Sequence, residues 1–254
     1  MTDSVIVDQV DGVQVISINR PEARNAINRA VSEAVAAAVD ELDQRADLTL
    51  GIITGTGGNF CAGMDLKAFL AGELVALPGR GLAGFVQHPP RKPMIAAVEG
   101  WALAGGFEIA LACDLIVAAE DARFGIPEVK RGLVAAAGGL LRLPRRIPPA
   151  IAMQLALTGE PLDAADASRL GLVNQLTAPG QALDGALDLA RRITQNGPLA
   201  VRITKQILDQ AADGTIAEGF ARQQPLVAQI LASADAREGA AAFAGKRPPA
   251  WTGR

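Results

Sequence analysis

The fold class is decided by residues 94–119, which read MIAAVEGWALAGGFEIALACDLIVAA. Two short apolar runs, at 94–98 and 115–118, flank a longer apolar segment that begins near Gly105. Short apolar runs of this length are typical of buried strands, and the segment between them is long enough for a helix. Strands alternating with helices at this spacing predict an α/β fold rather than an all-β fold or a helical bundle.

The chain on either side of this unit continues the pattern. Towards the N-terminus we expect a hairpin of strands at 4–8 and 13–18 joined at Asp11-Gly12, a helix from about 28 to 46, and a buried strand at 48–54. From about Arg191 onward the pattern is almost entirely helical, with apolar stripes at 201–212, 216–232 and 236–244. Residues 66–90 contain several Gly and Pro and predict a mobile loop or short helix near the substrate.

The composition sets limits on location and partners. The chain has 254 residues, 50% of them hydrophobic, a net charge of −3 and no Tyr. A slightly negative net charge does not indicate the basic surface that binds nucleic acid. The first residues, Met1-Thr2-Asp3-Ser4, are not a basic segment followed by an apolar run, and no apolar stretch is long enough to span a bilayer. With only Cys61 and Cys113, which we expect to be packed thiols, the sequence predicts a cytoplasmic protein without membrane or nucleic-acid partners.

The first candidate for chemistry is the segment from Gly105 to Glu108. Adjacent glycines at a helix start leave the backbone N–H groups open to an anion or oxyanion, although they also permit close packing. Glu108 lies in the first turn of that helix, where the helix dipole stabilises a carboxylate. The neighbouring residues are apolar, and a glutamate on a buried helix is costly unless it is paired or functional.

Two further segments could complete such a site. Glu128 follows Pro127 in a stiff turn after a predicted strand, where an ordinary solvated acid is the alternative. The loop 59–66 follows a buried strand and could offer a second N–H to a developing oxyanion, or could simply connect strand and helix with Asp65 as N-cap. Two carboxylates facing one substrate could divide acid and base roles.

Four motifs, taken in order, resemble the enoyl-CoA hydratase/isomerase (crotonase) family: residues 19–26 (NRPEARNA), 60–66 (FCAGMDL), 104–108 (AGGFE) and 124–128 (FGIPE). The resemblance covers essentially the whole chain and extends to residues 138–144 and 243–248. It implies a crotonase-like spiral of β-β-α turns in residues 1–195. It also implies a helical C-terminal trimerisation region in residues 196–254, in a homotrimer or dimer of trimers.

The resemblance also implies the site. Met64 and Gly105 would supply the two N–H groups that bind the thioester oxygen, and Glu108 and Glu128 would be the catalytic glutamates. The acyl-CoA substrate would be bound by residues of three segments, with CoA as part of the substrate and no separate cofactor: Arg24, Ala26, Ala62, Asp65, Leu66, Phe243 and Lys246. The last two match tail positions that often reach CoA from a neighbouring subunit, although Lys246 could equally be a solvated charge.

Some residues depart from the hydratase pattern. Ala136 stands where many hydratases have a Gly whose N–H faces the catalytic water, and its methyl group would resist a positive φ. Residues 139–151 look more like the carnitinyl-CoA dehydratase branch, so the acyl group stays open. The only histidine, His88, is expected in a surface loop, and no Cys/His cluster has metal-ligand spacing.

We therefore expect a lyase that hydrates an enoyl-CoA thioester reversibly, through an oxyanion hole and two glutamates. The alternatives are an enoyl-CoA isomerase or other enolate chemistry on an acyl-CoA, and a non-catalytic CoA-binding paralogue.

Overall fold

The computed structural model describes residues 3–211 and 213–254. Its larger sheet has six strands in the order β1-β2-β3-β4-β6-β9. Their bounds are Val5–Val10, Val13–Ile18, Leu50–Gly55, Met94–Val98, Leu115–Ala119 and Gln175–Thr177. The first pair is an antiparallel hairpin, and from β2 onward all neighbours run parallel. The predicted α/β class, the hairpin and the three central strands are confirmed.

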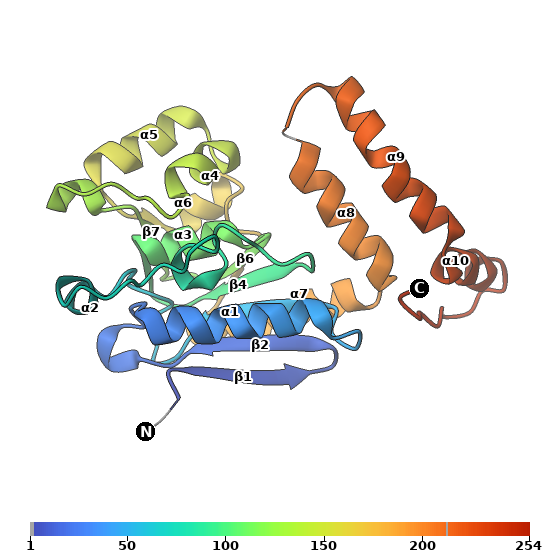
Figure 1. Ribbon diagram of the computed structural model, residues 1–254, viewed down its shortest axis with the longest axis horizontal. Helices are drawn as coiled ribbons and strands as arrows, with labels where there is room; N and C mark the ends of the chain where they lie inside the picture. Colours follow the sequence, from blue (N-terminus) through green and yellow to red (C-terminus); the bar gives the residue numbers. More distant parts are fainter. Residues whose placement is uncertain (1–2, 212) are drawn as a thin grey trace.

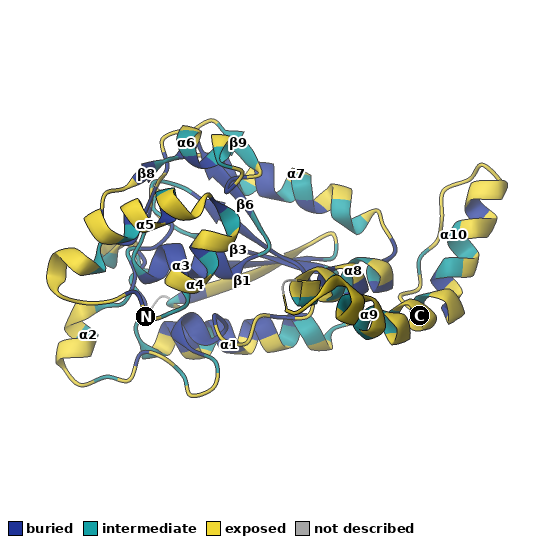
Figure 2. Ribbon diagram, turned by 90° about the horizontal axis from the view of Figure 1, so that it is seen from above, coloured by how far each residue is buried: buried dark blue, intermediate teal, exposed yellow. Residues whose placement is uncertain are grey.

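Helices cover both faces of this sheet. Alternate residues of a strand point to opposite faces, and along β2 Val13 and Val15 pack with α7 (Ala182–Thr194). Ile16 and Ile18 pack into the larger core with α1 (Arg29–Gln44) and α3 (Gly105–Ala112). Figure 2 shows α1 and α7 on opposite sides of the strands, with their buried residues turned towards the sheet. Strands covered on both faces explain the uninterrupted apolar runs in the sequence.

A smaller sheet carries the segments around the two glutamates. It consists of β5 (Trp101–Leu103), β7 (Arg123–Gly125) and β8 (Leu162–Asp163), with β5 parallel to β7 and β8 antiparallel to β7. These strands have two or three residues each, which is too short for a period-2 pattern, so the sequence does not predict them. The 3-10 turn η3 (Glu128–Arg131) follows β7.

Short helices and turns fill the connections. They are the turns η1 (Pro21–Ala23) and η2 (Leu82–Gly84), and the helices α2 (Leu66–Leu70), α4 (Gly139–Arg146), α5 (Pro149–Thr158) and α6 (Ala164–Arg169). The expectation of a short helix within 66–90 is thus confirmed, and Asp65 is its N-cap, accepting from the amides of Lys67 and Ala68. None of the helices in the described ranges is long and apolar enough to cross a membrane.

Three C-terminal helices extend away from the sheets. They are α8 (Pro198–Ala211), α9 (Ile216–Ala232) and α10 (Ala234–Ala244), close to the predicted segments, except that Ala212 lies outside the described residues. Figure 1 shows α8 and α9 side by side, with α10 at the end of the molecule opposite α2. α9 has no buried residue, although it carries apolar side chains such as Phe220 and Leu231. Within one chain these side chains have no core to enter.

Close packing of α3 on the loop before it gives a first test. A Cβ added to Gly106 would lie 2.1 Å from the carbonyl oxygen of Cys61, a backbone atom that cannot move aside cheaply. We expect Gly106→Ala to lower the free energy of unfolding by at least ~2 kcal/mol, because overpacking forces the backbone apart. Thermal unfolding at fixed protein concentration measures it.

Gly219→Ala in α9 is the matched control. An added Cβ there meets no heavy atom within 4 Å, and alanine is the better helix former by up to about 1 kcal/mol. Its melting temperature should stay level or rise. Equal melting temperatures for the two variants would contradict the close approach at Gly106.

Candidate active site

Three chain segments run parallel to one another, and the residues that follow them lie at one edge of the smaller sheet. The Cys61 amide donates to the Trp101 carbonyl at 3.0 Å, and the Leu103 amide donates to the Cys61 carbonyl at 3.0 Å, which attaches the loop before Met64 to β5. On its other side β5 pairs with β7, and the Ala104 amide donates to the Gly125 carbonyl at 2.8 Å. Because the carboxyl ends of parallel strands meet, the residues after Cys61, Leu103 and Gly125 come together.

Two backbone amides face each other across this edge. A Cβ on Gly63 would lie 3.0 Å from the Gly105 nitrogen, and one on Gly105 would lie 3.5 Å from the Met64 nitrogen. Gly105 begins α3, so its amide has no acceptor within the helix. Neither this amide nor that of Met64 donates a hydrogen bond to any residue in 3–211 or 213–254. The structure thus brings Met64 and Gly105 together as a pair of free donors.

The residue before Gly105 has a strained backbone conformation, which sets the direction of the Gly105 amide. Ala104 has φ 51° and ψ −129°, a left-handed conformation that a residue with a side chain seldom adopts. The sequence predicts that the two glycines open the backbone ahead of the helix. Instead both lie inside the first turn of α3, and the unusual dihedral belongs to the alanine before them. A residue in such a conformation costs about 1–3 kcal/mol, so the conformation persists only where the neighbouring structure holds it, and such residues cluster at functional sites.

Glu108 lies on the buried face of α3, with only 2% of its surface exposed. Its Oε1 accepts hydrogen bonds from the amides of Ala137 and Gly139, both at 2.8 Å. Burial raises the pKa of the Glu108 carboxyl above its ordinary value, while the two amides and the charge of Arg142 oppose that rise. The predicted buried acid is therefore confirmed in position, and its carboxylate is held by hydrogen bonds.

Glu128 begins η3 directly after Pro127 and is half-buried. Its Oε2 is buried and has no hydrogen-bond partner among the described residues. Burial raises the pKa of the Glu128 carboxyl, its own amide lowers it, and the nearby charge of Glu108 raises it further. The two acids are thus close enough to affect each other, but they differ: one carboxylate is held by two amides, and the other has a buried oxygen without a hydrogen-bond partner among the described residues.

The candidate CoA-binding residues of the N-terminal half form a second cluster beside Met64. The Ala62 amide donates to the Arg24 carbonyl at 3.0 Å, and the isolated parallel bridge between Ile27 and Met64 continues this pairing past Ala26. An ion pair of 3.0 Å joins Asp65 to Arg20. Leu66, the first residue of α2, is exposed.

Phe243 and Lys246 are not part of this cluster in the same chain. Phe243 lies on α10, is 89% exposed, and Lys246 follows the end of that helix. Figures 1 and 2 both place α10 at the opposite end of the molecule from α2. A single chain therefore presents Arg24, Ala26, Ala62, Asp65 and Leu66 together, and leaves the two tail residues remote.

The turn after η3 differs from its expectation. Ala136 is exposed and does not have a positive φ; in this turn the left-handed residue is Gly138, with φ 99°. The concern that a methyl group at Ala136 would strain the backbone is therefore wrong. Sequence reasoning missed the two amides that do bind Glu108, those of Ala137 and Gly139. The pair Gly138-Gly139 was the available signal.

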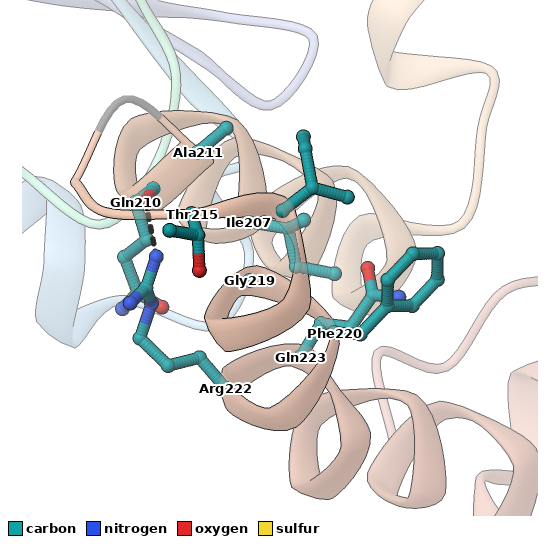
Figure 3. Close-up of a pocket in the computed structure, with 9 residues that line it drawn as sticks. Ile207, Gln210, Ala211, Thr215, Gly219, Phe220, Arg222 and Gln223 are labelled. Atoms are coloured by element: carbon teal, nitrogen blue, oxygen red, sulfur yellow. Dashed lines mark hydrogen bonds between the residues drawn. The ribbon is translucent and has the colours of Figure 1, made fainter.

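Other places in the fold fit acid–base chemistry less well. A cavity of about 180 Å³ between α8 and α9 is lined by apolar and neutral polar side chains together with Arg222 (Figure 3), and it contains no acid. A second, of about 590 Å³, lies between α8 and the core, but there Lys205 pairs with Asp114 at 2.7 Å and also faces Asp209. His88 is exposed, and no group of three or more His, Cys, Asp or Glu in the described ranges is arranged to hold a metal.

The raised pKa of Glu108 gives a stability prediction. The folded chain holds this proton more tightly than the unfolded chain, so burial of the carboxylate reduces stability above the folded pKa and costs nothing below about pH 4, where both states are protonated. Glu108→Gln cannot ionise and keeps an oxygen for the two amides. It should be more stable than the unmodified chain at pH 8, by about 1 kcal/mol.

Melting temperatures at pH 4 and pH 8 test this. The advantage of Glu108→Gln should shrink as the pH falls. Glu120→Gln, at an exposed position after β6, is the reference for removing a surface charge. A Glu108→Gln variant less stable than the unmodified chain at pH 8 would show that the carboxylate is not strained by burial.

Comparison with known proteins agrees with this arrangement. The sequence matches the enoyl-CoA hydratase/isomerase family over residues 8–254. It is 41% identical to a carnitinyl-CoA dehydratase of Salmonella arizonae, over all of both chains.

Solved structures include an enoyl-CoA hydratase of Mycobacterium marinum, 60% identical with a TM-score of 0.98, covering 99% of this chain and 100% of the other. Another is a carnitinyl-CoA hydratase of Mycobacterium avium, 45% identical with a TM-score of 0.81 over all of both chains. The predicted resemblance and the crotonase fold are confirmed, and the chain belongs to the enoyl-CoA hydratase/isomerase family.

Proposed function

We propose that the protein is an acyl-CoA lyase that adds water reversibly across the Cα–Cβ double bond of an enoyl-CoA thioester. The observation that carries the proposal is a buried and a half-buried carboxylate on the segments that also bring two free backbone amides together. Hydration of an enoyl thioester passes through an enolate, so it needs charge stabilisation at the carbonyl oxygen and proton transfer at carbon. The relatives named as hydratases and dehydratases support the same reaction class.

In this proposal Met64 and Gly105 donate their N–H groups to the thioester oxygen. Glu108, ionised, takes a proton from water as the water oxygen bonds to Cβ. The π electrons move towards the thioester and form the enolate, whose negative charge lies at the oxygen between the two amides. Glu128, protonated, then gives its proton to Cα. Water is added overall, and the cycle closes when Glu108 releases the proton that it took from water and Glu128 takes up a proton again.

The division of roles is supported by the different surroundings of the two acids. Two amide donors and the charge of Arg142 favour the ionised form of Glu108. Glu128 has an oxygen without a donor, and the charge of Glu108 disfavours its ionisation. Carboxylates whose environments push their pKa values apart are suited to acting as base and acid in one site.

We further propose that CoA binds along Arg24, Ala26, Ala62, Asp65 and Leu66, and that Phe243 and Lys246 contribute from a neighbouring subunit. The remote position of α10 in its own chain supports this division. The exposure of Ile216, Phe220 and Leu231 on α9 also supports it, because large apolar side chains gathered on one exposed helix are usually covered by another subunit. A trimer or dimer of trimers, with residues 196–254 as its oligomerisation region, would cover it.

The cytoplasm is the proposed location. Cys61 and Cys113 are both buried free thiols, and burial raises the pKa of each to about 12. Reduced, unreactive thiols are in keeping with a reducing compartment.

Substitution of the glutamates tests the catalytic proposal. Glu108→Gln and Glu128→Gln should each lower kcat for crotonyl-CoA by about 10²–10⁴-fold, since each removes one proton-transfer group. Binding of CoA itself should change little, because neither residue belongs to the proposed CoA cluster. Glu120→Gln, on an exposed surface, should have normal turnover. An unchanged rate in either test variant would remove that residue from the mechanism.

The choice of reaction and acyl group needs a substrate panel in labelled water. A hydratase transfers ¹⁸O from water into its product, whereas an isomerase moves only protons. We expect the label in the 3-hydroxyacyl product of crotonyl-CoA, and carnitinyl-CoA is included in the panel because of the named relatives. Product without ¹⁸O would indicate an isomerase, and tight CoA binding without turnover of any thioester would indicate a non-catalytic paralogue.

Native mass spectrometry tests the assembly. We expect three or six times the 26.2 kDa chain mass. Phe220→Asp should shift the protein towards single chains, because it places a charge in an exposed apolar patch that we expect another subunit to cover. Gln229→Asp adds the same charge to α9 without removing an apolar side chain and should leave the assembly intact, because Gln229 is exposed on the face of the helix opposite Phe220. A single-chain mass for the unmodified protein would contradict the proposed assembly.

A further inference from the structure

The turn that binds Glu108 is only partly buried. Its amides at Ala137 and Gly139 hold the carboxylate; Gly139 is buried, Ala137 is partly buried against the core, and Ala136 is exposed. The conformation of such a turn depends on side chains that bind its carbonyl groups. Because the turn binds the Glu108 carboxylate, any movement of the turn also moves the carboxylate.

Arg142, from the first turns of α4, reaches back to the turn. Its Nη1 donates to the Ala137 carbonyl at 3.4 Å, and its Nη2 donates to the carbonyl of Val86 at 2.5 Å. Val86 is fully buried just after η2, so the guanidinium connects the partly buried turn to the core. Gly138 leaves the space for it, because a Cβ there would lie 2.2 Å from Nη1. The planar fork of arginine suits two carbonyls in this way, and lysine does not offer it.

We propose that Arg142 is a positioning residue, which clamps the Ala137–Gly139 turn onto Glu108 and keeps that carboxylate the ionised member of the pair. The second half of this statement rests on the proposed function. Arg142 touches neither the reacting atoms nor the free amides. It acts through the peptide groups on Glu108 and through its positive charge.

Among the charged side chains around Glu108, Arg142 is the one that lowers the pKa of its carboxyl. The elements packed against α3 are α4, β5 and η2, and the last two carry no titratable side chain. On α4 the charged residues are Arg142, Arg145 and Arg146, and only the first affects the pKa of Glu108. From η3, Glu128 is the facing acid, with Arg131 beside it. Burial lowers the pKa of Arg142, but a guanidinium stays charged at neutral pH.

Three variants separate the clamp from the charge. Arg142→Met loses both, Arg142→Lys keeps the charge but loses the fork, and Arg145→Met on the same helix is the matched control, because Arg145 is exposed and makes no hydrogen bond with its side chain in the described part of the chain. Arg142→Met should lower kcat for crotonyl-CoA by about 100-fold, the loss typical of a catalytic group displaced by an ångström. KM should change less than about twofold, as the thioester contacts are untouched.

The pH profile distinguishes this role from a purely structural one. The acid limb of kcat/KM reports the ionisation of the base, and it should move to higher pH in Arg142→Met, as the favourable charge is lost. In Arg142→Lys the limb should stay near its original position while kcat remains low. Arg145→Met should leave both unchanged. A fall in kcat without movement of the limb in Arg142→Met would overturn the charge role, and unchanged kcat in both Arg142 variants would overturn the clamp.

A readout without turnover keeps this inference separate from the proposed function. ¹³C NMR of protein labelled at the glutamate carboxyl carbons, with Glu108 assigned by its loss in Glu108→Gln, measures the pKa of Glu108 directly. The pKa should be higher in Arg142→Met than in Arg145→Met. Equal values would overturn the charge role of Arg142 even if the enzyme hydrates crotonyl-CoA. Absence of turnover in the unmodified enzyme would overturn the proposed function, whatever the NMR shows.

Discussion

The pairing of three short parallel segments underlies everything at the site. β5 lies between the loop at Cys61 and strand β7, and its hydrogen bonds to both bring Met64, Gly105, Glu108 and Glu128 to one edge. None of these segments is long enough to be stable alone. Each is held because the chain on either side enters the large sheet or the core beneath α1, so the small sheet gains its order from the large one. The dihedral strain at Ala104 is retained on the same basis.

Burial acts on the two acids in the same direction, and hydrogen bonding distinguishes them. Desolvation raises the pKa of both carboxyls, so burial does not by itself assign one as base and the other as acid. The amides of Ala137 and Gly139 oppose this rise at Glu108, whereas the buried oxygen of Glu128 has no partner in the described structure. A backbone turn therefore gives two similar carboxyls different surroundings, and this difference underlies the proposed division into base and acid.

The sequence predicted the parts of this arrangement that depend on local chemistry. Apolar runs buried on both faces gave the strands β3, β4 and β6, and the hairpin at Asp11-Gly12 and the cap at Asp65 follow from turn and capping preferences. The motif around Glu108 indicated a buried acid at a helix start. What the sequence lacked is long-range: β5 and β7 have three residues each, and their pairing cannot be derived from periodicity. The assignment of the positive φ to Ala104 rather than to a glycine depends on that pairing too.

The strain that the sequence predicts at Ala136 falls elsewhere for the same reason. A motif comparison gives each residue the role of its counterpart in the family. In this turn the positive φ lies two residues after Ala136, at Gly138. The amides that bind Glu108 belong to Ala137 and Gly139. The exposed Ala136 is therefore free of the strain that would have argued against hydration. In this turn, backbone geometry carries the chemistry, and side-chain identity matters most at Gly138, where any Cβ would displace the guanidinium of Arg142.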